Sequence, residues 1–160
     1  MKKEIQIQYD FFKDAGQLDA TGQMLFDKAK AVRENAYAPY SRFLVGCAML
    51  LENGEVVTGS NQENAAFPSG TCAERSAIFW CAANFPGVKI KKLFVVGGPK
   101  DAPEKSVPTP PCGACRQSIL EYESLQDTGI EVYFASVKGE VCKTSSVKDL
   151  LPFSFDAKFL

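Results

Sequence analysis

Two short cysteine motifs constrain this chain more than any other feature of its sequence. The first is Cys72-Ala73-Glu74, and the second is Pro111-Cys112-Gly113-Ala114-Cys115. The chain contains no histidine, so a metal site built from these motifs takes all three protein ligands from cysteine. The fold must then bring the first motif against the second. Three protein ligands leave a fourth position open for water, which is typical of a catalytic zinc site rather than a structural one.

The composition indicates one globular domain without a basic surface. The 160 residues are 46% hydrophobic, which is enough to bury one core. The net charge is −1, whereas a nucleic-acid-binding protein normally carries a basic surplus. No apolar run follows Met1-Lys2-Lys3, and none elsewhere approaches membrane-spanning length. We therefore expect a cytoplasmic protein with neither a nucleic-acid polymer nor a membrane as partner, whose six cysteines are thiols or metal ligands.

Periodicity and turn signals predict alternating strands and helices. Strands are expected at residues 5–9, 43–51, 55–59, 92–97, 130–135 and 141–144. Helices are expected at residues 18–35, from the first cysteine motif to 84, from the second motif to 125, and at 147–151. Asn53-Gly54 is a strong hairpin signal between the second and third strands. This order favours an α/β domain with a mixed sheet and helices packed on it.

The chemistry of the two motifs is that of a zinc-dependent hydrolase. Each motif lies at the start of a predicted helix, where the backbone amides and the helix dipole stabilise thiolates. Cys112 and Cys115 are three residues apart, so they can hold one metal together. Bound Zn²⁺ lowers the pKa of its water to near 7, and Glu74 is placed to move the protons. A C-x-x-C pair alone would equally fit a redox pair or structural zinc.

Three thiolates and one Zn²⁺ carry a net charge of −1, which should weaken the metal as a Lewis acid. Arg75 is adjacent to Glu74 and is predicted to donate hydrogen bonds to one or two of the thiolates. The alternative for Arg75 is an ordinary surface position on the helix. The remaining cysteines have no motif around them and are expected to be small buried hydrophobic residues: Cys47, Cys81 and Cys142.

From about Thr21 to Phe155 the chain resembles the small cytidine deaminases. A non-ligand Glu beside three cysteines and a P-C-x-x-C half is described for zinc nucleobase deaminases. The resemblance rests on ordered motifs: Ala38-Pro39-Tyr40-Ser41, Phe43-x-Val45-Gly46, Asn61-x-Glu63-Asn64-Ala65, Cys72-Ala73-Glu74-Arg75, Pro111-Cys112-Gly113-Ala114-Cys115-Arg116-Gln117 and Leu150-Leu151-Pro152. It implies a three-layer α/β/α fold with a central mixed five-stranded sheet. Residues 1–20 would be an extension carrying an extra N-terminal strand, and residues 21–160 the single deaminase domain.

The resemblance implies hydrolytic deamination of cytidine and 2′-deoxycytidine to uridine and 2′-deoxyuridine, with release of ammonia, in pyrimidine salvage. Zinc-bound hydroxide would attack C4 of the base while Glu74 shuttles protons. The implied cofactor is one Zn²⁺ per subunit, and its implied ligands are Cys72, Cys112 and Cys115.

Substrate contacts follow from the same resemblance. Phe43 would pack beside the nucleoside, Ala73 would contact it, and Asn61 and Glu63 would bind the ribose 3′-hydroxyl. An amide and a carboxylate suit a hydroxyl, which both donates and accepts hydrogen bonds. A 3′-phosphate would be repelled by Glu63, so a free nucleoside is expected. The family commonly has Tyr where this chain has Phe67, so a hydroxyl contact with the sugar is not expected there.

The resemblance also implies a homotetramer whose active sites are completed by neighbouring subunits. Phe155, after Leu150-Leu151-Pro152, would stack on the base bound by an adjacent subunit, and Phe153 is the competing candidate. A core or C-terminal anchoring role is the alternative for these rings. Arg75 and Gln117 are expected to lie next to the metal ligands and hold them in place without binding the metal.

Three other functions are weighed against cytidine deamination. A blasticidin-type aminonucleoside deaminase would share the zinc motifs, but the Asn61-x-Glu63 pair favours an ordinary ribose. A polynucleotide-editing deaminase would need a basic, aromatic-lined path, which the sequence lacks. A non-catalytic, zinc-stabilised binding protein would have no use for Glu74 as a proton shuttle.

Overall fold

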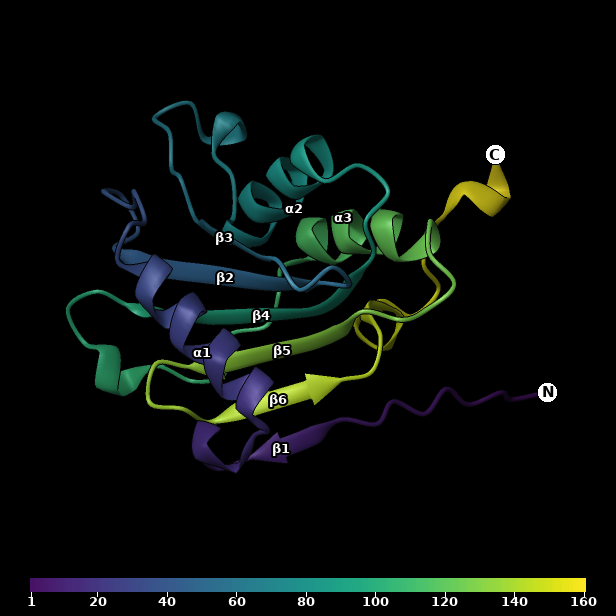
Figure 1. The fold of residues 1–160 in the computed structure, drawn as a ribbon, viewed down its shortest axis with the longest axis horizontal. Coiled ribbons are helices and arrows are strands. Elements are labelled where there is room, and N and C mark those ends of the chain that lie inside the picture. Colours follow the sequence, from purple (N-terminus) through teal and green to yellow (C-terminus); the bar gives the residue numbers. More distant parts are fainter.

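Six strands form one mixed sheet in the computed structural model, which describes residues 1–160 (Figure 1). The strand order is β1-β6-β5-β4-β2-β3; β4 and β5 are parallel, and every other neighbouring pair is antiparallel. The strands are β1 Asp10–Phe12, β2 Phe43–Leu51, β3 Val56–Ser60, β4 Ile90–Pro99, β5 Glu131–Ser136 and β6 Val141–Thr144. The predicted five-stranded sheet with an added N-terminal strand is confirmed.

Three helices cover the two faces of the sheet, as the resemblance implied. They are α1 Ala20–Arg33, α2 Ala73–Asn84 and α3 Gly113–Ser124. Five short 3-10 helices complete the fold: η1 Ala15–Gln17, η2 Phe67–Ser69, η3 Pro103–Lys105, η4 Val147–Leu150 and η5 Ala157–Phe159. None of the helices has both the length and the apolar character needed to cross a membrane.

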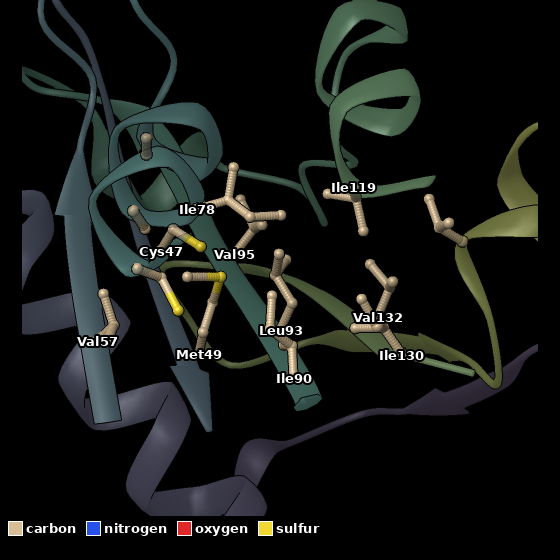
Figure 2. Close-up of a cluster of buried hydrophobic side chains, with 14 of the residues drawn as sticks. Cys47, Met49, Val57, Ile78, Ile90, Leu93, Val95, Ile119, Ile130 and Val132 are labelled. Carbon is tan, nitrogen blue, oxygen red and sulfur yellow. The ribbon is translucent and has the colours of Figure 1, made fainter. Parts of the chain in front are cut away.

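The core is divided by the sheet into two apolar clusters. One packs α2 and α3 against the sheet; Figure 2 shows Ile78 and Ile119 from these helices beside strand residues such as Met49, Leu93 and Val132. The other packs α1 against the opposite face through Leu25, Phe26 and Ala29. Packing on one face of the sheet therefore holds α2 and α3 side by side, and the two cysteine motifs lie at the start of these helices.

Two strand glycines set how closely the helices approach the sheet. A Cβ on Gly46 of β2 would collide with the backbone of Ala29 in α1. A Cβ on Gly59 of β3 would lie 2.7 Å from the Ala77 nitrogen and 2.8 Å from the Ala73 oxygen in α2. Real Cβ atoms do not tolerate such distances, so glycine at these positions is required by the close approach of each helix.

The first strand does not lie where the sequence predicts it. The alternating pattern predicts a strand at residues 5–9, whereas the structure forms β1 at Asp10–Phe12. A strand forms only where a neighbour accepts and donates its backbone hydrogen bonds. The neighbour is β6, which ends at Thr144, and its residues Val141 to Lys143 pair with Phe12 to Asp10. Residues 5–9 extend past the end of β6 and have no strand beside them.

Candidate metal centre and active site

The cysteine motifs begin two helices that lie on the same face of the sheet. Cys72 and Cys112 are the N-cap residues of α2 and α3, and both have extended backbone conformations. Neither side chain caps its own helix, so both thiols are free to turn toward a metal. The N-terminal amides of both helices favour negative charge at this point. The prediction that both motifs lie at helix N-termini is confirmed.

The three sulfur atoms are close enough to share one metal ion. All three Sγ atoms lie within 4.8 Å of one another, with Cys72 and Cys112 separated by 3.8 Å and Cys112 and Cys115 by 3.4 Å. A tetrahedral zinc with Zn–S bonds of about 2.3 Å places its sulfurs about 3.8 Å apart. The cluster therefore fits zinc in both donor chemistry and spacing. The other three cysteines lie outside it, and Cys47 and Cys81 are buried as expected.

The charge of the cluster is balanced by a neighbouring arginine. Nη2 of Arg75 lies 3.8 Å from Sγ of Cys72, and Nε of Arg75 is buried without a hydrogen-bond partner. In the metal-free protein, a hydrogen bond from Cys115 and the guanidinium of Arg75 lower the pKa of Cys72 to about 5, against the opposing effect of burial. The hydrogen bond between Cys115 and Cys72, together with burial, raises the pKa of Cys115.

Glu74 is a buried carboxyl beside the thiols. It lies in the first turn of α2, and only 4% of its surface is exposed. Loss of hydration raises its pKa to about 7, and the negative charge of Cys72 acts in the same direction. A carboxyl with a pKa near neutrality is suited to both accept and return a proton at physiological pH. Such a group next to a metal site is a candidate general acid and base.

A hollow of about 500 Å³ opens in front of Cys72. Asn61 and Glu63 line it, together with other residues of the loop between β3 and α2 and of the Tyr40-Ser41 turn. Oε2 of Glu63 accepts the backbone N–H groups of Tyr40 at 2.9 Å and Ser41 at 3.3 Å. The hydroxyl of Ser41 is the largest cause of the lowered pKa of Glu63, and these two backbone N–H groups act in the same direction against the effect of burial. No hydrogen bond within the chain engages Oε1, so this oxygen is free to accept from a ligand.

Asn61 holds the start of β2 in place. Its amide oxygen accepts the N–H of Val45 at 2.8 Å, and its amide nitrogen donates to the carbonyl of Phe43 at 2.9 Å. An amide offers two donors and two acceptor sites, so one of each remains for a ligand. Phe43 is the first residue of β2 and is 37% exposed. The structure thus joins Asn61 directly to Phe43, a link that the two separate motifs did not reveal.

The C-terminal segment is tied to α3 but does not enter the hollow of its own chain. The amide of Gln117 donates to the Phe155 carbonyl at 2.9 Å, and Arg116 donates to the carbonyls of Pro111 at 2.8 Å and Leu150 at 2.7 Å. Phe155 stacks on Phe159 and remains 57% exposed. The α3 residues that follow the second motif therefore fix the position of this segment.

The structure brings the predicted metal-site residues together. Cys72, Cys112, Cys115, Glu74 and Arg75 converge, with Ala73 buried between Cys72 and Glu74 at the start of α2. The sequence did not reveal the role of Tyr40 and Ser41, which orient Glu63. It also did not reveal the role of Gly59, which allows α2 to approach the sheet closely. The Ala38-Pro39-Tyr40-Ser41 motif was a signal for the turn, but only the folded chain shows what its N–H groups bind.

Comparisons with known proteins agree on one family. A family model described as the cytidine and deoxycytidylate deaminase zinc-binding region matches residues 20–128. A cytidine deaminase of Halalkalibacterium halodurans is 40% identical over 137 residues, which cover 85% of this chain and 95% of that protein. One from Sporosarcina psychrophila is 38% identical over 138 residues, covering 86% and 93%.

Solved structures show the same likeness. The cytidine deaminase from Burkholderia pseudomallei superposes with a TM-score of 0.71 at 41% identity, covering 83% of this chain and 98% of that one. The Mycobacterium tuberculosis cytidine deaminase gives a TM-score of 0.66 at 32% identity, covering 86% and 98%.

Proposed function

We propose that this chain, which belongs to the cytidine and deoxycytidylate deaminase family, converts cytidine and 2′-deoxycytidine to uridine and 2′-deoxyuridine. The reaction is hydrolytic: water replaces the exocyclic amine at C4, and ammonia leaves. The observation that carries the proposal is the buried Glu74 carboxyl beside three convergent thiols, with a nucleoside-sized hollow opening onto Cys72. Pyrimidine salvage in the cytoplasm is the proposed setting.

The residues of the cluster have distinct roles in this reaction. Cys72, Cys112 and Cys115 would hold one zinc ion, which when bound supplies a water acidic enough to react at neutral pH. Glu74 accepts a proton from the reacting water and passes it to the ring nitrogen N3. It then accepts the proton of the new C4 hydroxyl and gives it to the departing amine, which leaves as ammonia. Arg75 offsets the excess negative charge of three thiolates. Gln117 positions the C-terminal segment by donating a hydrogen bond to the Phe155 carbonyl.

The substrate is held by the loop on the other side of the hollow. Glu63 accepts the O–H of the ribose 3′-hydroxyl through its free Oε1, and the remaining N–H of Asn61 donates to the oxygen of the same hydroxyl. Phe43 packs beside the nucleoside, and Ala73 contacts the base. The carboxylate of Glu63 repels a 3′-phosphate, which favours substrates with a free 3′-hydroxyl over polynucleotides.

The active site is completed in a homotetramer. Phe155 stacks on the base bound by a neighbouring subunit, which accounts for an exposed aromatic ring held in place by Gln117 rather than by a core. Stacking on the base supplies apolar burial that the polar loop of the hollow lacks.

The decisive experiment follows the loss of ultraviolet absorbance when zinc-loaded protein is mixed with cytidine. We expect conversion to uridine that a chelator abolishes and added zinc restores. Glu74→Gln should lower kcat by about 10²- to 10⁴-fold while retaining one zinc per chain. Glu121→Gln, a matched change at an exposed carboxyl of α3, should leave kcat unchanged. Absence of turnover in the zinc-loaded parent protein would refute the assignment.

A further inference from the structure

The first nine residues form an extended arm with no strand beside it. Figure 1 shows this segment continuing in line with β1 and running away from the body of the protein. All of residues 1–11 are exposed, and no secondary structure forms before Asp10. β1 is itself the edge of the sheet, because only β6 pairs with it. The outer backbone groups of β1 and the whole arm are therefore unpaired.

The arm has the sequence of a strand with one apolar face. Its odd-numbered apolar residues are substantially exposed: Ile5 at 56%, Ile7 at 47%, Tyr9 at 62% and Phe11 at 53%. The even-numbered positions between them are polar from Lys2 to Asp10. Strict alternation is the pattern of a strand that has one face buried.

The sheet fixes the side on which this apolar face lies. Phe12 packs into the α1 cluster, so Phe11 points to the opposite face. There Phe11 pairs with Cys142 of β6, which is only half-buried. A long, apolar, unpaired edge is a template for another strand. It carries no proline or bulge that would block such pairing.

We propose that two copies of the chain join through these arms, which pair antiparallel about a two-fold axis into a two-stranded ribbon that links the two sheets. A symmetric strand pair is self-complementary, as a two-fold interface requires. The N–H and C=O groups of alternate residues of the arm then find partners in the second copy, and the apolar faces of the two arms become one continuous surface. This interface is independent of the catalytic proposal, since the arm contributes nothing to the hollow in front of Cys72.

Charge and polarity select one register. Opposite residues of an antiparallel pair share a face, so apolar side chains meet only if the two-fold axis passes through a residue and not between two. An axis at Gln6 places Ile5 opposite Ile7 and Lys2 opposite Asp10 of the second copy. An axis at Ile7 would instead place Glu4 opposite Asp10, and like charges directly opposite are destabilising. An axis at Ile5 leaves Asp10 beyond the end of the partner arm, and an axis at Gln8 places Lys3 opposite Lys13.

Cysteine cross-linking tests this register in the full-length, zinc-loaded protein. At the two-fold position, the side chains of a Gln6→Cys variant lie about 5 Å apart, within disulfide reach. In a Gln8→Cys variant they are displaced by four residues along the strand, or about 14 Å. Mild oxidation should convert Gln6→Cys to a covalent dimer and leave Gln8→Cys at the parent background. Equal cross-linking of both variants, or of neither, would overturn the proposal.

The mass of the assembly in solution provides a second test. Replacing both Ile5→Lys and Ile7→Lys should lower the sedimenting mass relative to the parent protein, because lysines then meet across the apolar face while the contact proposed for Phe155 is untouched. Gln8→Lys adds the same kind of charge opposite Glu4 and should leave the mass unchanged. An unchanged mass in the double variant means that the arms do not hold the copies together, and the proposal fails.

Discussion

Replacing Gly59→Ala should displace α2 from the sheet and thereby disturb the metal centre. The added methyl would lie 2.7 Å from the Ala77 nitrogen and 2.8 Å from the Ala73 oxygen, both of them backbone atoms that no rotamer change can move. Ordinary packing begins at 3.4 Å, so α2 must retreat by about 0.7 Å. Overpacking of this kind costs about 1–3 kcal/mol of stability.

The same retreat moves the reacting groups. Cys72 is the N-cap residue of α2 and Glu74 lies in its first turn, so both shift with Ala73, whereas Cys112 and Cys115 on α3 stay in place. Metal–ligand distances tolerate about 0.2 Å. We therefore expect weaker zinc binding and a fall in kcat/KM of about 10- to 100-fold, because a displacement near 1 Å is costly in catalysis.

A glycine in the other motif provides the matched control. Gly113 opens α3 between Cys112 and Cys115, and a Cβ there meets nothing within 4 Å. Gly113→Ala should keep zinc and activity, and should raise stability by at most about 1 kcal/mol. Urea unfolding, zinc content and cytidine turnover measured on both variants decide the matter. Wild-type stability and turnover in Gly59→Ala would show that the packing of α2 on β3 does not control the site.

Two further predictions concern a buried carboxylate and the thiols. Glu123 accepts hydrogen bonds from the N–H of Ile130 at 2.8 Å, the N–H of Val147 at 3.1 Å and the hydroxyl of Ser146 at 2.5 Å. Glu123→Ala should therefore lower the free energy of unfolding in urea by about 3–5 kcal/mol, and Ser146→Ala by about 1 kcal/mol. Equal losses in the two variants would contradict this. In chelated protein, Cys72 has a depressed pKa of about 5 and is already a thiolate above it, so iodoacetamide should modify it at a nearly constant rate from about pH 6 to about pH 8. A Cys72 rate that rises tenfold per pH unit over this range, followed by mass spectrometry, would exclude the lowered pKa.

The strands and helices could be predicted where the local pattern is sufficient. The strand at 43–51 was predicted with its exact bounds, because a long apolar run ends in the Asn53-Gly54 turn. Both motif helices begin at their cysteines as predicted. The strand at 5–9 was misplaced, because its alternation is real but its partner strand ends too early. Periodicity reports which residues would suit a strand, and only the fold decides whether a neighbour is present.

The site was predictable in its chemistry but not in its connections. Three thiols and a carboxyl can be read from spacing alone, whereas the burial that brings the pKa of Glu74 to about 7 depends on how α2 packs. Asn61 donates to the carbonyl of Phe43 and accepts from the N–H of Val45, and these two bonds join segments that only the sheet brings together. Such long-range contacts leave no local signal in the sequence.

The two sides of the site are held by different means. Cys72 and Glu74 are at the start of α2, which packs against the sheet at Gly59. Cys112 and Cys115 are at the start of α3, which packs in the same apolar cluster, so the core fixes the positions of all four groups. The sugar side is a loop, held by backbone pairs between Gln62 and Thr71 at 2.8 Å and from Glu63 to Tyr37 at 2.8 Å. Since Glu63 already gives one oxygen to the Tyr40-Ser41 turn, sugar recognition depends on its one remaining acceptor. Reactivity is thus set by the layers of the fold, and substrate choice by a loop that can vary without moving the metal ligands.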